Sequence, residues 1–156
     1  MGMDPAQPFL LTDRFWMPIR DGNLTALQIF DRHYTSNRAH VRRVAQFVGP
    51  GEKYVLITPD AGALFVWRKF IDHADDGSGQ PQRGVNCAVF RRETGVRASD
   101  MIREADALAD EKWPGERHYT YVNARKVKSE NPGCCFLKAG WRRCGVTRGG
   151  LLILER

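Results

Sequence analysis

The sequence predicts an α+β protein in which helices flank a mostly antiparallel sheet. Several short apolar runs stand between Gly- and Pro-rich turns, a pattern typical of strands. Two other segments repeat apolar residues at three- and four-residue intervals, which indicates amphipathic helices. The chain has 156 residues, of which 42% are hydrophobic, and this suits one domain with one core. We expect that domain over residues 9–156, after a flexible leader over residues 1–8.

The first expected elements are an edge segment and a helix. Phe9–Pro18 is apolar and aromatic, and it suits either an edge strand or a packing arm, because Pro18 is disfavoured in a central strand. Asn23 then provides a cap for a helix over Leu24–Tyr34. Its expected apolar face consists of Leu24, Leu27, Phe30 and Tyr34.

A meander of strands is expected next. Val44–Val48 and Tyr54–Thr58 flank a turn rich in glycine and proline, which predicts a hairpin. Ala63–Ile71 and Val85–Phe90 are the next two candidate strands, and a polar loop separates them. About four antiparallel strands therefore precede the second helix.

The second half of the chain contains the clearest helix, Ser99–Asp110. Ser99 is a suitable N-cap, and Pro114 follows the end of the helix. The apolar stripe of this helix consists of Met101, Ile102, Ala105, Leu108 and Ala109. A strand over His118–Val122, a short helix over Cys134–Ala139 and a closing strand over Leu151–Leu154 complete the expected order.

Charge and cysteine content narrow the function classes. The net charge is +6, and the basic residues cluster, which suits a polyanionic partner, although a solvated basic surface is the alternative. The four cysteines contain no CxxC pair, so we expect no metal site and reduced thiols. Neither a signal peptide nor an apolar run of roughly 20 residues is present, so we expect a cytoplasmic protein with no membrane contact. The oligomeric state is left open.

A late segment, Asn131–Trp141, carries a family resemblance. Its Asn, short helix, aromatic residue, Gly and second aromatic residue resemble the late motif of the GNAT (GCN5-related N-acyltransferase) superfamily. Asn131, Phe136, Gly140 and Trp141 match that motif by type and spacing. The resemblance covers about Leu24 to Glu155, and it implies a mixed, mostly antiparallel GNAT-like sheet and acetyl-CoA or another acyl-CoA as cofactor.

The turn after the fourth expected strand resembles the superfamily's phosphate loop in part. Arg92 and Gly95 match the pattern, whereas Arg97 stands where Gly or Ala is usual, and Glu93 adds a negative charge. Glycine and a helix N-terminus suit close approach of a pyrophosphate. A plain strand-to-helix turn without a ligand is the alternative. The cofactor-binding residues that the resemblance implies are Val89, Phe90, Arg92, Gly95, Arg97, Ala98, Ser99, Asn131 and Phe136.

The resemblance also implies how acyl transfer would occur. The fourth and fifth strands of the superfamily splay apart, and a backbone N–H, here that of Val89 or Phe90, holds the acyl carbonyl. Phe136 falls near the position where a Tyr often protonates the leaving thiol, so Tyr119, Tyr121 or a water would substitute. Cys134 and Cys135 lack a matched His partner, which disfavours a catalytic thiol.

The early His33–Tyr34 pair is similar to a pair in the phage Mom family, which modifies adenine in DNA through a GNAT-like domain. That similarity implies a DNA base or amine as acceptor, in a bacterial host cell, with His33 and Tyr34 engaging the acceptor. His33 complementing a helix C-terminus and Tyr34 packing in the core is the alternative. A flipped base needs a basic rim and an aromatic platform, for which the candidates are Arg38, Arg42, Arg43, Trp67, Arg68 and Lys69. A non-catalytic module that binds DNA or protein, and an N-acetyltransferase of small amines or proteins, are the alternative functions.

Overall fold

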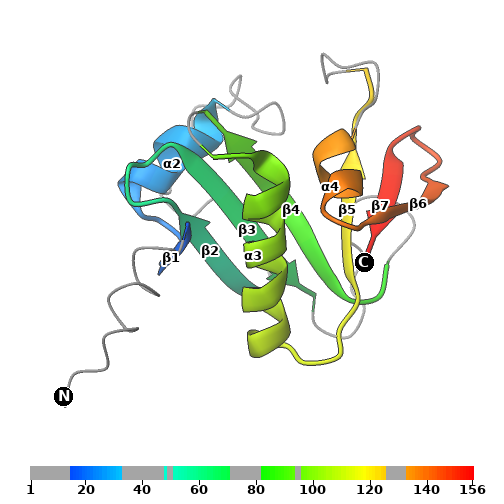
Figure 1. The fold of residues 1–156 in the computed structure, drawn as a ribbon, viewed down its shortest axis with the longest axis horizontal. Coiled ribbons are helices and arrows are strands. Elements are labelled where there is room, and N and C mark those ends of the chain that lie inside the picture. The colour runs from blue at the N-terminus through cyan, green and yellow to red at the C-terminus, as the bar shows by residue number, and fades with distance from the viewer. Residues whose placement is uncertain (1–14, 33–47, 49–50, 71–81, 94–95, 126–132) are drawn as a thin grey trace.

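The computed structural model is a mixed α+β protein whose single seven-stranded sheet has the order β1-β2-β3-β4-β5-β7-β6 (Figure 1). It describes residues 15–32, 48, 51–70, 82–93, 96–125 and 133–156. Three helices occur among these residues. The elements are β1 (Met17–Ile19), α2 (Leu24–Asp31), β2 (Glu52–Ile57), β3 (Ala63–Lys69), β4 (Val85–Arg92), α3 (Ala98–Lys112), β5 (His118–Val122), α4 (Cys134–Lys138), β6 (Arg142–Val146) and β7 (Leu152–Glu155).

The sheet is mostly antiparallel, as expected. β1 to β4 form an antiparallel meander, and β5, β7 and β6 form a second antiparallel group. The parallel pairing of β4 with β5 joins the two groups. The expected strand Val44–Val48 falls almost entirely outside the described residues.

Side chains that alternate along the strands build a core on each face of the sheet. On one face, Phe65 and Trp67 of β3 pack with α3 and α4, and on the other, Leu64 and Val66 pack with α2. Figure 1 shows α3 lying across the sheet and α4 beside β5. The two helices that border the candidate site therefore share a face.

The α2 helix begins where expected, but its buried face differs from the prediction. The Asn23 side chain accepts a hydrogen bond from the Ala26 N–H, which confirms the cap. Ala26 and Ile29 are the buried residues, whereas Leu24 is 70% exposed. The prediction that Leu24 belongs to the core face is wrong, because the helix turns Ala26 and Ile29 toward Leu64 and Val66 of the sheet.

The α3 helix confirms the predicted apolar stripe, since all five of its residues are buried. Its start differs from the prediction. Arg97 occupies the N-cap position without a side-chain cap bond, and Ser99 lies inside the helix, buried at 3% exposure. The predicted capping role of Ser99 is therefore wrong, and the first turn is left without a side-chain acceptor from its N-cap residue.

The N-terminal segment ends in an edge strand that is fixed to α3. Pro18 lies in β1, which pairs with β2 at the sheet edge, as a proline-containing strand should. The indole Nε1 of Trp16 donates to the Met101 carbonyl at 2.8 Å, and the Glu104 carboxylate accepts from the Phe15 and Trp16 N–H groups. The opposite edge strand, β6, was not expected as a separate strand, and all five of its residues are exposed. None of the helices in the described part of the chain is long and apolar enough to cross a membrane.

Candidate functional site

The two halves of the sheet separate between β4 and β5. The strands pair over three residues only, from Val85↔His118 to Cys87↔Thr120, although β4 runs on to Arg92 along β3. In Figure 1 the strands diverge beyond this point, and α4 lies on the side of β5. An opening in the sheet therefore begins after Cys87.

A bulge in β4 marks the start of this opening. Val66 pairs with Val89 and Trp67 pairs with Cys87, so Ala88 is an extra residue in β4. Such a residue bends its strand and increases the local twist. At the other, closed end, Gly84 has φ +113° and lies so close to the Arg117 carbonyl that no side chain fits between them. The close contact at Gly84 therefore holds β4 and β5 together at one end, and the bend at Ala88 marks where the opening between them begins.

A hollow of about 680 Å³ lies at the end of β4, between the first turn of α3 and α4. The hollow is positively charged, because four of the eight described residues that line it are cations and none of these eight is acidic. The lining residues are Arg92, Arg97, Ala98, Ser99, Arg103, Cys134, Cys135 and Lys138. Four of these were predicted to bind phosphate (Arg92, Arg97, Ala98 and Ser99), and the structure brings them to one surface.

The first turn of α3 adds partial positive charge to the hollow. Backbone N–H groups at a helix start lack intrahelical acceptors and favour an anion. The Arg103 guanidinium crosses to α4, where it donates to the Lys138 carbonyl at 2.5 Å, and it also contacts Asp100 at 2.9 Å. Arg92 donates to the Val96 carbonyl at 3.3 Å. The arginines that bridge α3, α4 and the end of β4 thus shape the hollow as well as charge it.

Glu93 was expected to place a negative charge near a bound phosphate, but it faces α2 instead. Its carboxylate forms a bidentate pair with Arg32, at 2.6 and 2.7 Å, and a third bond with Arg91 at 3.0 Å. The hydrogen bonds from Arg32 are the main cause that lowers the pKa of Glu93 to about 2. Glu93 is not among the described residues that line the hollow, and its charge is paired with those of two arginines.

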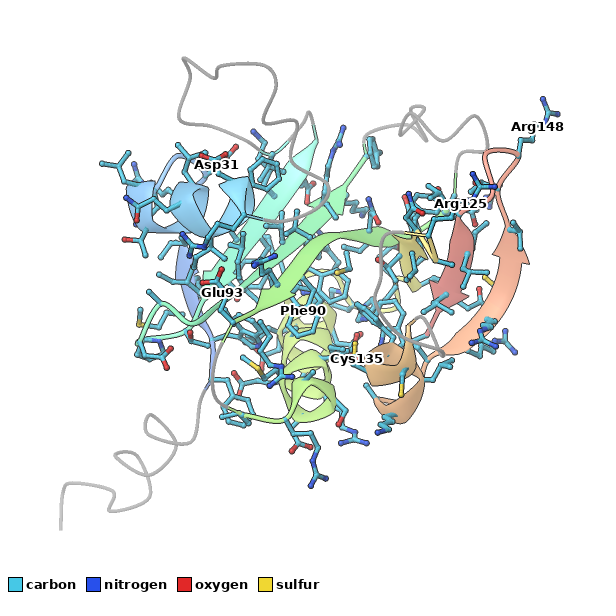
Figure 2. All side chains as sticks on the ribbon, turned by 90° about the horizontal axis from the view of Figure 1, so that it is seen from above. Asp31, Phe90, Glu93, Arg125, Cys135 and Arg148 are labelled. Atoms are coloured by element: carbon cyan, nitrogen blue, oxygen red, sulfur yellow. The ribbon has the colours of Figure 1, made fainter. Side chains whose placement is uncertain are left out.

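The wall next to the hollow is aromatic. Phe90 of β4 contacts Phe136 of α4 edge-to-face at 6.0 Å, and it also contacts Trp16 and Phe65. Figure 2 shows Phe90 and Cys135 near one another on the α3 side of the sheet. Burial is the main cause that raises the pKa of the Cys135 thiol. Phe90 and Phe136, both candidate cofactor-binding residues, therefore lie together beside the core, and Val89 is buried on the opposite face.

The two tyrosines predicted as proton donors sit on β5. Their rings pack edge-to-face at 5.7 Å, and the Arg117 guanidinium lies 5.2 Å from the Tyr119 ring. Tyr119 is completely buried, whereas Tyr121 is partly exposed. Neither lines the hollow, so of the two only Tyr121 is accessible to a substrate in this conformation.

Of the predicted nucleic-acid residues, the three that the structure describes do not line the hollow. Trp67 has no exposed surface, and its Nε1 donates to the Ala105 carbonyl, so the prediction of a stacking platform is wrong for Trp67. Arg68 stacks on Phe70, and Lys69 lies 3.8 Å from Glu116. Lys69 pairs with Val85, at the opposite end of β4 from Arg92, roughly 20 Å away. His33, Tyr34, Arg38, Arg42, Arg43, Gly95 and Asn131 lie outside the described residues.

Four of the described residues that line the hollow were not predicted as binding residues: Arg103, Cys134, Cys135 and Lys138. Arg103 and Lys138 face Arg97 from helix positions that a linear motif cannot reveal, although Arg103 stands one turn after Ser99, a spacing that places both residues on one helix face. Cys134 and Cys135 were weighed as metal ligands, as reduced thiols and as a catalytic thiol, but not as part of a binding surface. Their place in the hollow depends on how α4 packs against α3, which no local signal gives.

A buried polar cluster of Asp106, His118 and Trp141 connects elements that lie on the same face of the sheet as the hollow. The Asp106 carboxylate accepts from Trp141 Nε1 at 2.9 Å and lies 2.7 Å from His118 Nδ1. Asp106 and His118 are each 1% exposed. His118 Nε2 lies 3.2 Å from Asp110 Oδ1, but the two atoms are not aligned for a hydrogen bond. The cluster ties α3, β5 and the residue before β6 together.

Comparisons with protein-family models, curated proteins and solved structures find no match for this chain.

Proposed function

We propose that the chain is a GNAT-fold N-acyltransferase that uses acetyl-CoA or another acyl-CoA. The observation that carries the proposal is the coincidence of two features. The sheet opens between β4 and β5, and a cation-lined hollow lies at the same end of β4, against the first turn of α3. An elongated thioester with phosphates at one end suits such a pair of features.

The division of roles follows from charge and polarity. Arg92, Arg97, Arg103 and Lys138 offer cations to phosphates, and the N–H groups of the first turn of α3 add donors. The opening past Cys87 leaves the backbone of Val89 and Phe90 without pairing to β5. An N–H there would hold an acyl carbonyl and stabilise the charge that develops on its oxygen. A thioester supplies the activated acyl group when bound.

The acceptor in this proposal is a base or amine in DNA, as in the Mom family. The basic composition supports it, because a net charge of +6 suits a polyanionic acceptor. Arg68 and Lys69 do not contribute to a rim beside the hollow, given their place at the far end of β4. Acetylation of a small amine or protein uses the same cofactor site.

A specific observation favours a second candidate function, a non-catalytic binding module on the same scaffold. Phe136 offers no proton to a leaving thiolate, and Tyr119 is completely buried. A hollow that binds a phosphorylated ligand or nucleic acid without transfer would need neither residue. Salt-sensitive DNA affinity without any acyl-CoA binding would support this candidate over the transferase.

The transferase proposal is tested with the full chain, acetyl-CoA and three acceptor pools: duplex DNA, single-stranded DNA, and a set of small amines. Acetyl-CoA should raise the melting temperature of the chain. An acetyl mass increment should then appear on one pool and be absent when acetyl-CoA is omitted. A chain that is neither stabilised by acetyl-CoA nor able to acylate any pool would overturn the proposal.

A further inference from the structure

We propose that Cys134 is a covalent modification site: it forms a mixed disulfide with small anionic disulfides that the hollow gathers. The relevant reagents are disulfides that carry carboxylates or phosphates, such as glutathione disulfide or the disulfide of CoA. The inference rests on the positive charge of the hollow and not on acyl transfer.

The first step is the placement of two thiols in a cation-lined hollow. Cys134 and Cys135 line the same surface as Arg92, Arg97, Arg103 and Lys138. A concave site lined by one sign of charge raises the local concentration of opposite charge, by roughly 10-fold or more. An anionic disulfide is therefore concentrated where the thiols are exposed, and a neutral one is not.

The second step assigns the reaction to Cys134 rather than to Cys135. Cys135 packs against the core, where burial raises its pKa and reduces the thiolate available at neutral pH. Cys134 is half-buried and takes no part in that core cluster. Cys87 is buried at 3% exposure, beyond the reach of a reagent.

The third step explains why the mixed disulfide would persist. Neighbouring residues of a trans chain have Cα atoms about 3.8 Å apart, below the roughly 4.4–6.8 Å range of disulfides. Successive side chains on a helix also point in different directions. Both thiols belong to α4, so Cys135 is poorly placed to displace the bound group from Cys134.

The reaction balances without another redox partner. The Cys134 thiolate attacks one sulfur of the anionic disulfide and forms a new S–S bond. The original S–S bond breaks, and the other half leaves as a thiolate that takes a proton from water. The retained half adds an anionic group that would occupy the hollow and exclude a phosphorylated ligand.

The test uses the full chain with Cys144→Ser, because Cys144 is exposed and lies 3.5 Å from Arg117. Thiolation by glutathione disulfide is compared with thiolation by neutral 2-hydroxyethyl disulfide, and both rates are divided by those of a neutral cysteine peptide. Peptide mass mapping locates the adduct, and circular dichroism checks the fold of each variant. Arg97→Gln is the variant in the hollow, and Arg148→Gln is its charge-matched control, because Arg148 does not line the hollow and lies far from Cys135 in Figure 2.

The expected result is an adduct on Cys134 and a preference of roughly 10-fold for the anionic reagent at low salt. The preference should shrink in about 1 M salt, where the Debye length is about 3 Å. It should also shrink in Arg97→Gln but not in Arg148→Gln. Equal normalised rates for the two reagents, or an adduct on Cys135 or Cys87 instead, would overturn the inference.

An acetyl-CoA protection arm separates this inference from the proposed transferase function. Selective labelling of Cys134 that acetyl-CoA does not slow would support the inference and count against acyl-CoA binding. Labelling that acetyl-CoA slows but that shows no preference for the anionic reagent would overturn the inference about Cys134. The same result would support acyl-CoA binding in the hollow.

Discussion

The Arg32 guanidinium donates two hydrogen bonds to the Glu93 carboxylate, from Nε to Oε2 at 2.6 Å and from Nη2 to Oε1 at 2.7 Å. The pair connects the end of α2 with the end of β4, 61 positions away in the chain. It also directs the Glu93 carboxylate toward α2, and the described residues that line the hollow include no acidic side chain.

Removing this pair should lower stability in a pH-dependent manner. The pKa of Glu93 is about 2 in the folded chain against an ordinary 4.5, so its ionised form stabilises the fold fully above about pH 4.5. That contribution is lost as the pH falls toward 2. Glu93→Gln should lower the melting temperature by roughly 2–4 °C at pH 7, a modest value because Arg32 is partly exposed.

Differential scanning calorimetry at pH 7 and pH 3 measures this effect, with the exposed Glu111→Gln as control. The difference between the parent chain and Glu93→Gln should shrink at the lower pH. An equal loss at both pH values, or an equal loss in Glu111→Gln, would show that the Arg32–Glu93 pair does not stabilise the fold as described.

The close approach of β4 and β5 should make Gly84 far more sensitive than another glycine with positive φ. A Cβ on Gly84 would lie 2.1 Å from the Arg117 carbonyl oxygen, whereas a Cβ on Gly115 would meet no atom within 4 Å. Backbone strain at positive φ costs each alanine about 1 kcal/mol. Gly84→Ala should lose about 2 kcal/mol more, because the strands must move apart. Urea unfolding of both variants checks the difference, and similar losses would contradict the close approach.

Local pattern was sufficient for most elements of the fold. The three- and four-residue spacing of the α3 stripe and the apolar runs of β3 and β4 appear in the structure where the pattern predicted them. The start of α3 was predicted at Ser99, but the N-cap residue is Arg97. The sequence favours serine as a cap, and it does not show whether that serine is buried inside the helix. Leu24 was assigned to the wrong face, because only packing against Leu64 and Val66 selects Ala26 and Ile29.

The buried Asp106 should be among the most sensitive polar residues in the described part of the chain. Asp106→Ala leaves the Trp141 Nε1 and His118 Nδ1 donors without their acceptor in the core. An unpaired buried cluster of this kind should cost about 3 kcal/mol. Asp110→Ala, at a 45% exposed side chain on the same helix, is the matched control and should cost less than about 1 kcal/mol.

Chemical unfolding of the two aspartate variants, followed by circular dichroism, gives the comparison. A loss in Asp106→Ala no larger than that in Asp110→Ala would contradict the role of Asp106 as the acceptor that joins α3 to β5.

The candidate site could be predicted only in part from the sequence, for a physical reason. Arg92, Arg97, Ala98 and Ser99 are close in the chain, so a strand-to-helix turn places them together. Arg103 and Lys138 join them through the packing of α4 on α3, where the Arg103 guanidinium donates to the Lys138 carbonyl. Trp67 was a candidate platform beside a core alternative, because an aromatic residue between Val66 and Arg68 on a strand does not reveal whether a helix covers its face.

Titration calorimetry of acetyl-CoA into the full chain tests the central claim most directly, that the hollow at the start of α3 holds the phosphates of an acyl-CoA. The parent chain should bind, and Arg97→Gln should bind about tenfold more weakly, because one charge-assisted contact is lost. Arg148→Gln, which removes the same charge elsewhere, should bind as the parent does. Absence of binding to the parent chain, or equal weakening in both variants, would contradict the claim.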